Sequence, residues 1–110
     1  MNFSWQIVSL ETKDQTNDEG ATLQNAVVRV VWKRVGTDSE GVSHTFLGNS
    51  WFSAESTAAD DFIPYFDLTE SNIISWIETK LTAHEVGKID DIITNRINKK
   101  NTIVRTPHWS

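Results

Sequence analysis

The side chains most able to carry chemistry in this chain are three histidines and a few carboxylates. His44, His84 and His108 lie far apart in the sequence, without the close pair spacing that zinc ligands usually show. We interpret each histidine as a solvent-facing side chain on its own element. The sequence therefore predicts no metal site.

Asp60, Asp61 and Asp67 form an oxygen-rich group of the kind that calcium prefers, but the segment lacks the alternating ligands and central glycine of an EF-hand loop. Asp67 and Glu70 are spaced like an acid and base pair. Both, however, stand where a helix start favours carboxylates for capping and for the helix dipole. We expect a solvated acidic loop that leads into a helix cap.

Nucleophilic catalysis also lacks a candidate residue. The 110-residue chain contains no cysteine, and no serine has the flanking glycines of a nucleophile elbow. We therefore predict no catalytic residue, no cofactor and a protein that is not an enzyme.

Composition sets further bounds on the class of protein. The chain has a net charge of −5 and suits one domain, residues 1–110, which packing alone must stabilise. The acidic balance disfavours duplex DNA or an anionic membrane as a partner. The start of the chain lacks the pattern of a secretion signal, and no window has the roughly 20 apolar residues of a membrane span. We expect a soluble protein without a membrane partner.

Three segments have the pattern of strands. Phe3, Trp5 and Ile7 alternate with polar residues, which predicts a strand over residues 2–10. The polar residues 13–22 suit an exposed loop. Residues 24–35 are rich in valine and predict a central strand whose core face carries the set Ala26, Val28, Val30 and Trp32. Turn residues 36–41 and renewed alternation predict a hairpin to a third strand at 42–53.

Two segments have the pattern of helices. Thr69 is the expected N-cap of a helix over residues 70–81. Thr82 and Glu85 have the spacing of a capping box for a second helix over 83–99. Both helices carry an apolar stripe at helical spacing, made of Ile73, Ile74, Ile77, Leu81, Val86, Ile89, Ile93 and Ile97.

These elements predict an α+β fold. A three-stranded antiparallel meander is followed by two helices packed on one face of the sheet, because helices and sheet each have one apolar side to bury. An extended tail, residues 101–110, completes the chain.

Three segments of the chain are similar to parts of a known family. Residues 1–7 look like its first strand, residues 64–76 look like its helix entry, and Pro107-His108-Trp109 resembles its carboxy-terminal Pro-Trp. The family comprises small, uncharacterised proteins encoded by tailed bacteriophages, many of them marine or cyanobacterial. Here His108 separates Pro107 from Trp109, and the loop at residues 12–23 is longer. The resemblance implies a phage gene product with sheet before helices, and it carries no catalytic residue across.

Exposed aromatic residues are the best candidates for a functional surface. We expect Trp51 and Tyr65, beside the acidic loop, and Pro107, His108 and Trp109, in the tail, to contact a protein partner or a second copy of the chain. The leading interpretation is a non-catalytic phage protein that acts through protein contacts. It would be made in the host cytoplasm and would serve as a virion component or as an accessory to assembly or host takeover.

A basic-aromatic strand face supports the alternative interpretation. Arg29, Trp32, Lys33 and Arg34 together resemble a surface on which single-stranded nucleic acid stacks. This set would make the protein a small nucleic-acid-binding regulator.

Overall fold

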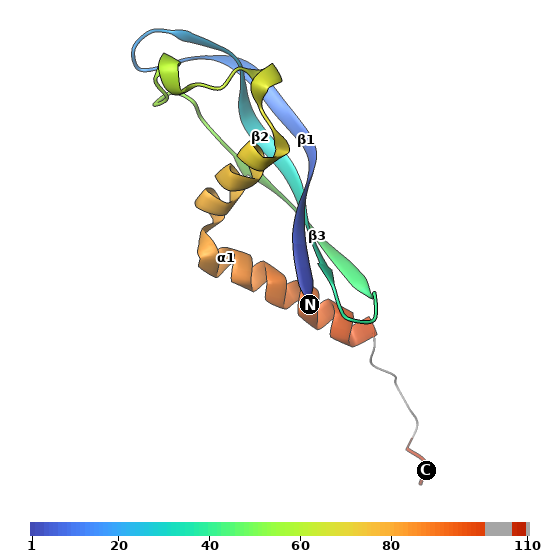
Figure 1. Ribbon diagram of the computed structural model, residues 1–110. Coiled ribbons are helices and arrows are strands. Elements are labelled where there is room, and N and C mark those ends of the chain that lie inside the picture. The colour runs from blue at the N-terminus through green and yellow to red at the C-terminus, as the bar shows by residue number, and fades with distance from the viewer. Residues whose placement is uncertain (101–106, 110) are drawn as a thin grey trace.

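Three long strands are followed by a helical region in the computed structural model, which describes residues 1–100 and 107–109. The strands are β1 (Asn2–Thr16), β2 (Thr22–Thr37) and β3 (Ser43–Trp51). Two short 3-10 helices, η1 (Ala59–Asp61) and η2 (Tyr65–Asp67), lie in the connection to α1 (Glu70–Lys100) (Figure 1). The predicted tail, residues 101–110, lies outside the described residues except for 107–109.

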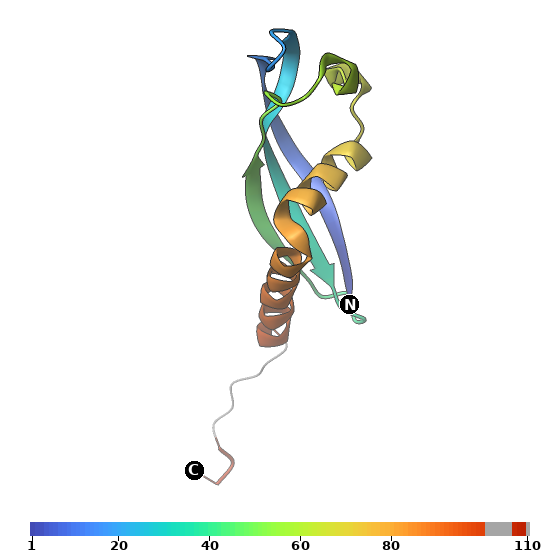
Figure 2. The same ribbon diagram turned by 90° about the vertical axis from the view of Figure 1, so that its left-hand side faces the viewer.

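The sheet is an antiparallel meander with the order β1-β2-β3, so the predicted α+β class and three-stranded antiparallel sheet are confirmed. Figure 2 shows β1 and β3 along the two borders of the sheet, with α1 passing in front of it. Since β2 is the central strand, its side chains contact those of both other strands.

The first hairpin is longer than the sequence pattern indicates. Residues 13–22 were expected to form a loop, but β1 continues to Thr16 and pairs with β2 up to Thr16–Thr22. The turn is organised by Asn17, whose Oδ1 accepts hydrogen bonds from the backbone N–H of Glu19 (3.1 Å) and Ala21 (2.8 Å). Polar residues are compatible with this part of the hairpin because most of them stay exposed.

A β-bulge changes which valines of β2 enter the core. Glu11 pairs with Arg29 and Thr12 pairs with Val27, so Val28 has no partner residue on β1. The extra residue breaks the alternation at this point, and Ala26 and Val27 are both buried. Val27 is consequently buried and Val28 only half-buried, which corrects the predicted core position of Val28.

The core lies between the sheet and α1. Its buried cluster joins side chains of β2 to the isoleucines of the helical region: Val27, Val30, Trp32, Ile73, Ile77, Ile89, Ile93 and Ile97. Trp32 is its largest member, with Trp5 edge-on at 5.2 Å and Phe46 stacked at 6.0 Å between ring centroids. Burial of these apolar side chains is the main stabilising term for a domain without crosslinks.

A kink divides the helical region. Residue Thr82 has φ 58° and ψ 155°, which are not helical values, yet α1 runs from Glu70 to Lys100 as one element. The kink falls at the predicted boundary between residues 81 and 83, although the two expected helices form one kinked element. The start of α1 is capped as expected, because Thr69 Oγ1 accepts a hydrogen bond from the Asn72 N–H at 3.2 Å.

Candidate protein-interaction site

One side of the sheet is not covered by the helical region, and we call it the open face. It is formed by the outward residues of β2 and β3, which alternate with the inward-facing pairs Val30–Ser50 and Trp32–Gly48. The cross-strand pairs on the open face are Arg29–Trp51, Val31–Asn49 and Lys33–Leu47. Leu47 and Trp51 are 64% and 60% exposed, respectively. Large apolar side chains thus stand in solvent at outward positions of one strand.

Arg29 contacts the Trp51 ring. Its guanidinium lies 5.4 Å from the centroid of that ring, and its Nη1 lies 3.2 Å from Glu11 Oε1 on β1. The three side chains therefore link all three strands across the open face. A cation–π contact of this kind contributes about 0.5–1 kcal/mol at an exposed site, so its main effect here is to orient the indole.

The backbone of Trp51 is held from the helical region. Lys80 Nζ donates a hydrogen bond to the Trp51 carbonyl oxygen and lies 4.9 Å from the centroid of the Phe52 ring. Phe52 in turn packs against Trp76 of α1, with 6.1 Å between ring centroids. The end of β3 is thus anchored to α1, and this leaves the Trp51 side chain as the exposed part.

Tyr65, the second predicted contact residue, lies on a different surface. It belongs to η2 and, with Phe66, borders a cavity of about 320 Å³ lined by Ile7, Leu10 and Ile73. The two rings meet edge-on at 5.2 Å, and Phe66 is 90% exposed. The structure therefore does not join Tyr65 to Trp51. Phe66 belongs to the same group of aromatic residues beside the acidic loop, and its ring is more exposed than that of Tyr65.

The remaining predicted contact residues lie near the end of the chain. Pro107, His108 and Trp109 are exposed, and the His108 and Trp109 rings meet edge-on at 5.1 Å. Trp109 is 79% exposed. The Trp109 indole is therefore exposed to solvent in the part of the chain that the structure describes.

The basic-aromatic set is divided between two sides of the sheet. Trp32 is 3% exposed, and its Nε1–H donates a hydrogen bond to Ser50 Oγ at 3.1 Å. Arg34 points to the helical region, where its Nε and Nη2 donate to the Asp90 carboxylate at 2.9 and 3.2 Å. Arg29 and Lys33 lie on the open face. Because the Trp32 indole is buried, its faces are not accessible for base stacking.

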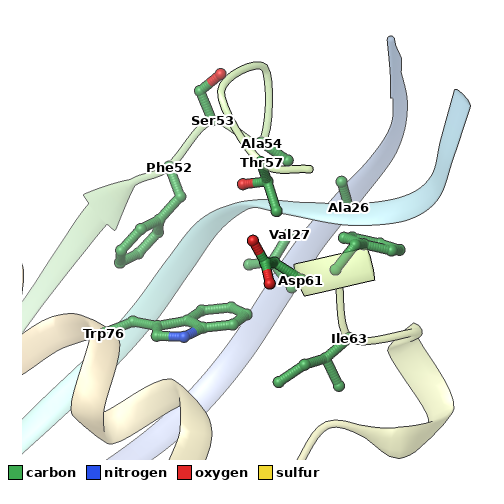
Figure 3. Close-up of a pocket in the computed structure, with 10 residues that line it drawn as sticks. Ala26, Val27, Phe52, Ser53, Ala54, Thr57, Asp61, Ile63 and Trp76 are labelled. Carbon is green, nitrogen blue, oxygen red and sulfur yellow. The ribbon is translucent and has the colours of Figure 1, made fainter. Parts of the chain in front are cut away.

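A separate cavity of about 340 Å³ lies where β2, the segment after β3 and α1 meet. Figure 3 shows Phe52, Ile63 and Trp76 around it, with the Asp61 carboxylate among these side chains. Asp61 is the one ionisable residue in its lining. Asp61 is exposed, and the described residues of this lining supply no second ionisable side chain to pair with it.

Clusters of potential metal ligands are not found in the described part of the chain. No group of three or more His, Asp or Glu side chains lies close enough there to hold a metal ion. Within residues 1–100 and 107–109, no helix is long and apolar enough to cross a membrane.

The fold and the open face define the chain as a small α+β protein with a single-layer, three-stranded sheet. The chain belongs to the family described as Domain of unknown function (DUF7936), whose model matches residues 1–109. No curated protein and no solved structure matches it.

Proposed function

We propose that this protein is a non-catalytic binding protein that contacts a protein partner through the open face. The observation that carries the proposal is the exposure of Leu47 and Trp51 on a sheet side that α1 does not cover. Aromatic residues on a rigid element are the usual anchors of protein interfaces. The contact with Arg29 favours one orientation of the Trp51 ring, which reduces the side-chain freedom lost on binding.

Charge defines the kind of partner. Arg29 and Lys33 supply two cations to the open face, and Glu11 of β1, which pairs with Arg29, supplies one carboxylate, so the charge left for a partner is that of Lys33. This contrasts with the net charge of −5 of the whole chain. A complementary partner therefore presents an apolar patch beside at least one carboxylate that faces Lys33.

The resemblance of three segments to phage proteins supports a role in a virion, in assembly or in host takeover. A virion component would be found at a fixed copy number in purified particles by quantitative mass spectrometry. An accessory protein would be found in infected cells but not in particles. The exposed Pro107, His108 and Trp109 would add a second contact in either setting.

A photo-crosslinking amino acid at position 51, introduced in the producing cell, tests the contact itself. We expect a discrete adduct with another protein, and no such adduct from the same group at the exposed position Ala83 on α1. Lys33→Glu should weaken the adduct because it places a carboxylate against the partner's carboxylates, whereas Lys88→Glu on α1 should not. Equal labelling from positions 51 and 83 would contradict the proposal.

A further inference from the structure

The outer border of β3 presents backbone hydrogen-bonding groups at regular intervals. The Asp38 N–H donates to the Val42 carbonyl at 2.9 Å, and the Phe52 N–H donates to the Val28 carbonyl at 2.9 Å. These two bonds identify the hydrogen-bonded pairs at the two ends of the β2–β3 ladder. Hydrogen-bonded pairs alternate with non-bonded pairs in an antiparallel ladder. The even-numbered residues of β3 therefore bond to β2. The odd-numbered residues direct their N–H and C=O groups away from the sheet: Ser43, Thr45, Leu47, Asn49 and Trp51.

The Trp51 end of this border already has a hydrogen-bond partner. The outward carbonyl of Trp51 accepts the hydrogen bond from Lys80 Nζ, which confirms the direction deduced from the ladder. The structure shows no partner, among the residues it describes, for the outward backbone groups of Ser43, Thr45, Leu47 and Asn49. A run of four such residues is a template for one more strand.

The sequence of β3 lacks the features that prevent edge pairing. Residues 42–54 contain no Asp, Glu, Lys, Arg or proline, and β3 pairs with β2 without a register shift. The other border differs, because two of the three register shifts between β1 and β2 leave a residue of β1 without a paired residue on β2, at Val8 and Asp14, and because β1 carries Glu11, Lys13 and Asp14. Bulges and charges of this kind protect an edge from association. The β3 border is thus the unprotected edge of the sheet.

We propose that β3 pairs with β3 of a second copy of this chain, in antiparallel orientation, to form a continuous six-stranded sheet. A second copy fits this edge because two-fold antiparallel pairing requires the same spacing of outward groups on both strands, and β3 supplies it to itself. The uncharged strand also avoids the like-charge repulsion that a chain of net charge −5 would otherwise meet.

The occupied Trp51 carbonyl determines the register in which the two copies of β3 pair. The four residues with available outward groups are centred on Phe46, so the two-fold axis passes through that position. Ser43 then pairs with Asn49 of the second copy, and Thr45 pairs with Leu47. Phe46 lies opposite Phe46 of the second copy in a non-hydrogen-bonded pair, where side chains approach most closely. Its half-buried ring, stacked on Trp32, would gain a second aromatic neighbour.

This inference goes beyond the proposed function, because it concerns the backbone border of β3 and not the open face. Sedimentation velocity over about two orders of magnitude in concentration should show a reversible monomer–dimer equilibrium. Thr45→Pro removes an outward N–H and no bond to β2, so it should leave the fold intact by circular dichroism and abolish the dimer. Thr45→Ala retains the N–H and should leave the dimer unchanged. A wild-type chain that stays monomeric, or a Thr45→Pro chain that still dimerises, would overturn the proposal.

Single cysteines test the register in a chain that has none of its own. Chains with Thr45→Cys and chains with Leu47→Cys should form a disulfide when mixed, because paired residues are about 5.5 Å apart at Cα. Neither variant alone should crosslink, since the corresponding diagonal distance is about 7–8 Å. Self-crosslinking of the Leu47→Cys chain would place the axis at residue 47 and overturn the register. Loss of the dimer would leave a heterologous adduct at position 51 unaffected, so the two proposals fail separately.

Discussion

Gly36 of β2 lies so close to Ile93 of α1 that a Cβ atom on residue 36 would stand 2.5 Å from Ile93 Cγ2. It would also stand 2.8 Å from Cε1 of Phe3 on the neighbouring strand. A side chain at this position would therefore push α1 away from the sheet. The absence of a side chain at residue 36 lets the second half of α1 pack directly on the central strand.

Gly36→Ala should consequently destabilise the protein by about 1–3 kcal/mol, the usual cost of overpacking a core. Chemical denaturation monitored by circular dichroism measures this change. Gly87→Ala is the matched control, because Gly87 lies in α1 with no atom within 4 Å of the added Cβ. That control should stabilise the protein by about 0.5–1 kcal/mol through helix propensity. Equal effects at the two positions would contradict the close approach.

Arg34 and Asp90 connect β2 to α1 by a half-buried, bidentate ion pair. Asp90→Ala leaves the Arg34 guanidinium without its carboxylate, beside the Phe3 and Trp5 rings, and should cost about 1–3 kcal/mol in unfolding free energy. The exposed neighbour Asp91→Ala should change it by less than about 0.5 kcal/mol. If the two variants unfold at the same denaturant concentration, the pair does not stabilise the fold.

Thr82 has a positive φ of 58° with ψ 155°, a combination that only glycine adopts without strain. Thr82→Gly should raise the unfolding free energy by about 1 kcal/mol, because relief of strain exceeds the added chain entropy and the loss of the 3.4 Å cap to the Glu85 N–H. Thr82→Ala, which keeps the strain and loses the cap, should be less stable than wild type. A Thr82→Gly chain less stable than Thr82→Ala would exclude a kink of this geometry.

Trp32 and Trp51 have different roles, because Trp32 belongs to the core and Trp51 lies on the open face. Trp32→Ala should cost about 3–5 kcal/mol, because it opens a cavity in the core cluster. Trp51→Ala should cost about 1 kcal/mol or less, since it removes an exposed ring and its contact with Arg29. Thermal unfolding of both variants provides the comparison. A large loss of stability in Trp51→Ala would mean that this ring is part of the fold and not available for binding.

The sequence was sufficient to predict the elements whose periodicity is regular. The isoleucines at 73, 77, 89, 93 and 97 recur at helical spacing and are all buried. Thr69 was recognisable as a cap from its position before this stripe. The inward direction of Trp32 followed from strand alternation.

Other features depend on contacts between distant residues and could not be predicted. Val27 replaces Val28 in the core because the bulge arises from the pairing with β1, and one strand alone does not define it. The extension of β1 to Thr16 depends on Asn17, whose Nδ2–H donates to the Thr57 carbonyl 40 positions away. The pairing of Arg34 with Asp90 spans 56 positions and separates Arg34 from Arg29 and Lys33.

Oxidative footprinting of the five tryptophans tests the binding role of the open face most directly. In the dilute purified protein, Trp51 should be modified quickly and Trp32 slowly, as their 60% and 3% exposures require. In the producing cell, Trp51 should become protected while Trp32 keeps its low rate. Modification of Trp51 at the same rate in both settings would contradict a partner on the open face.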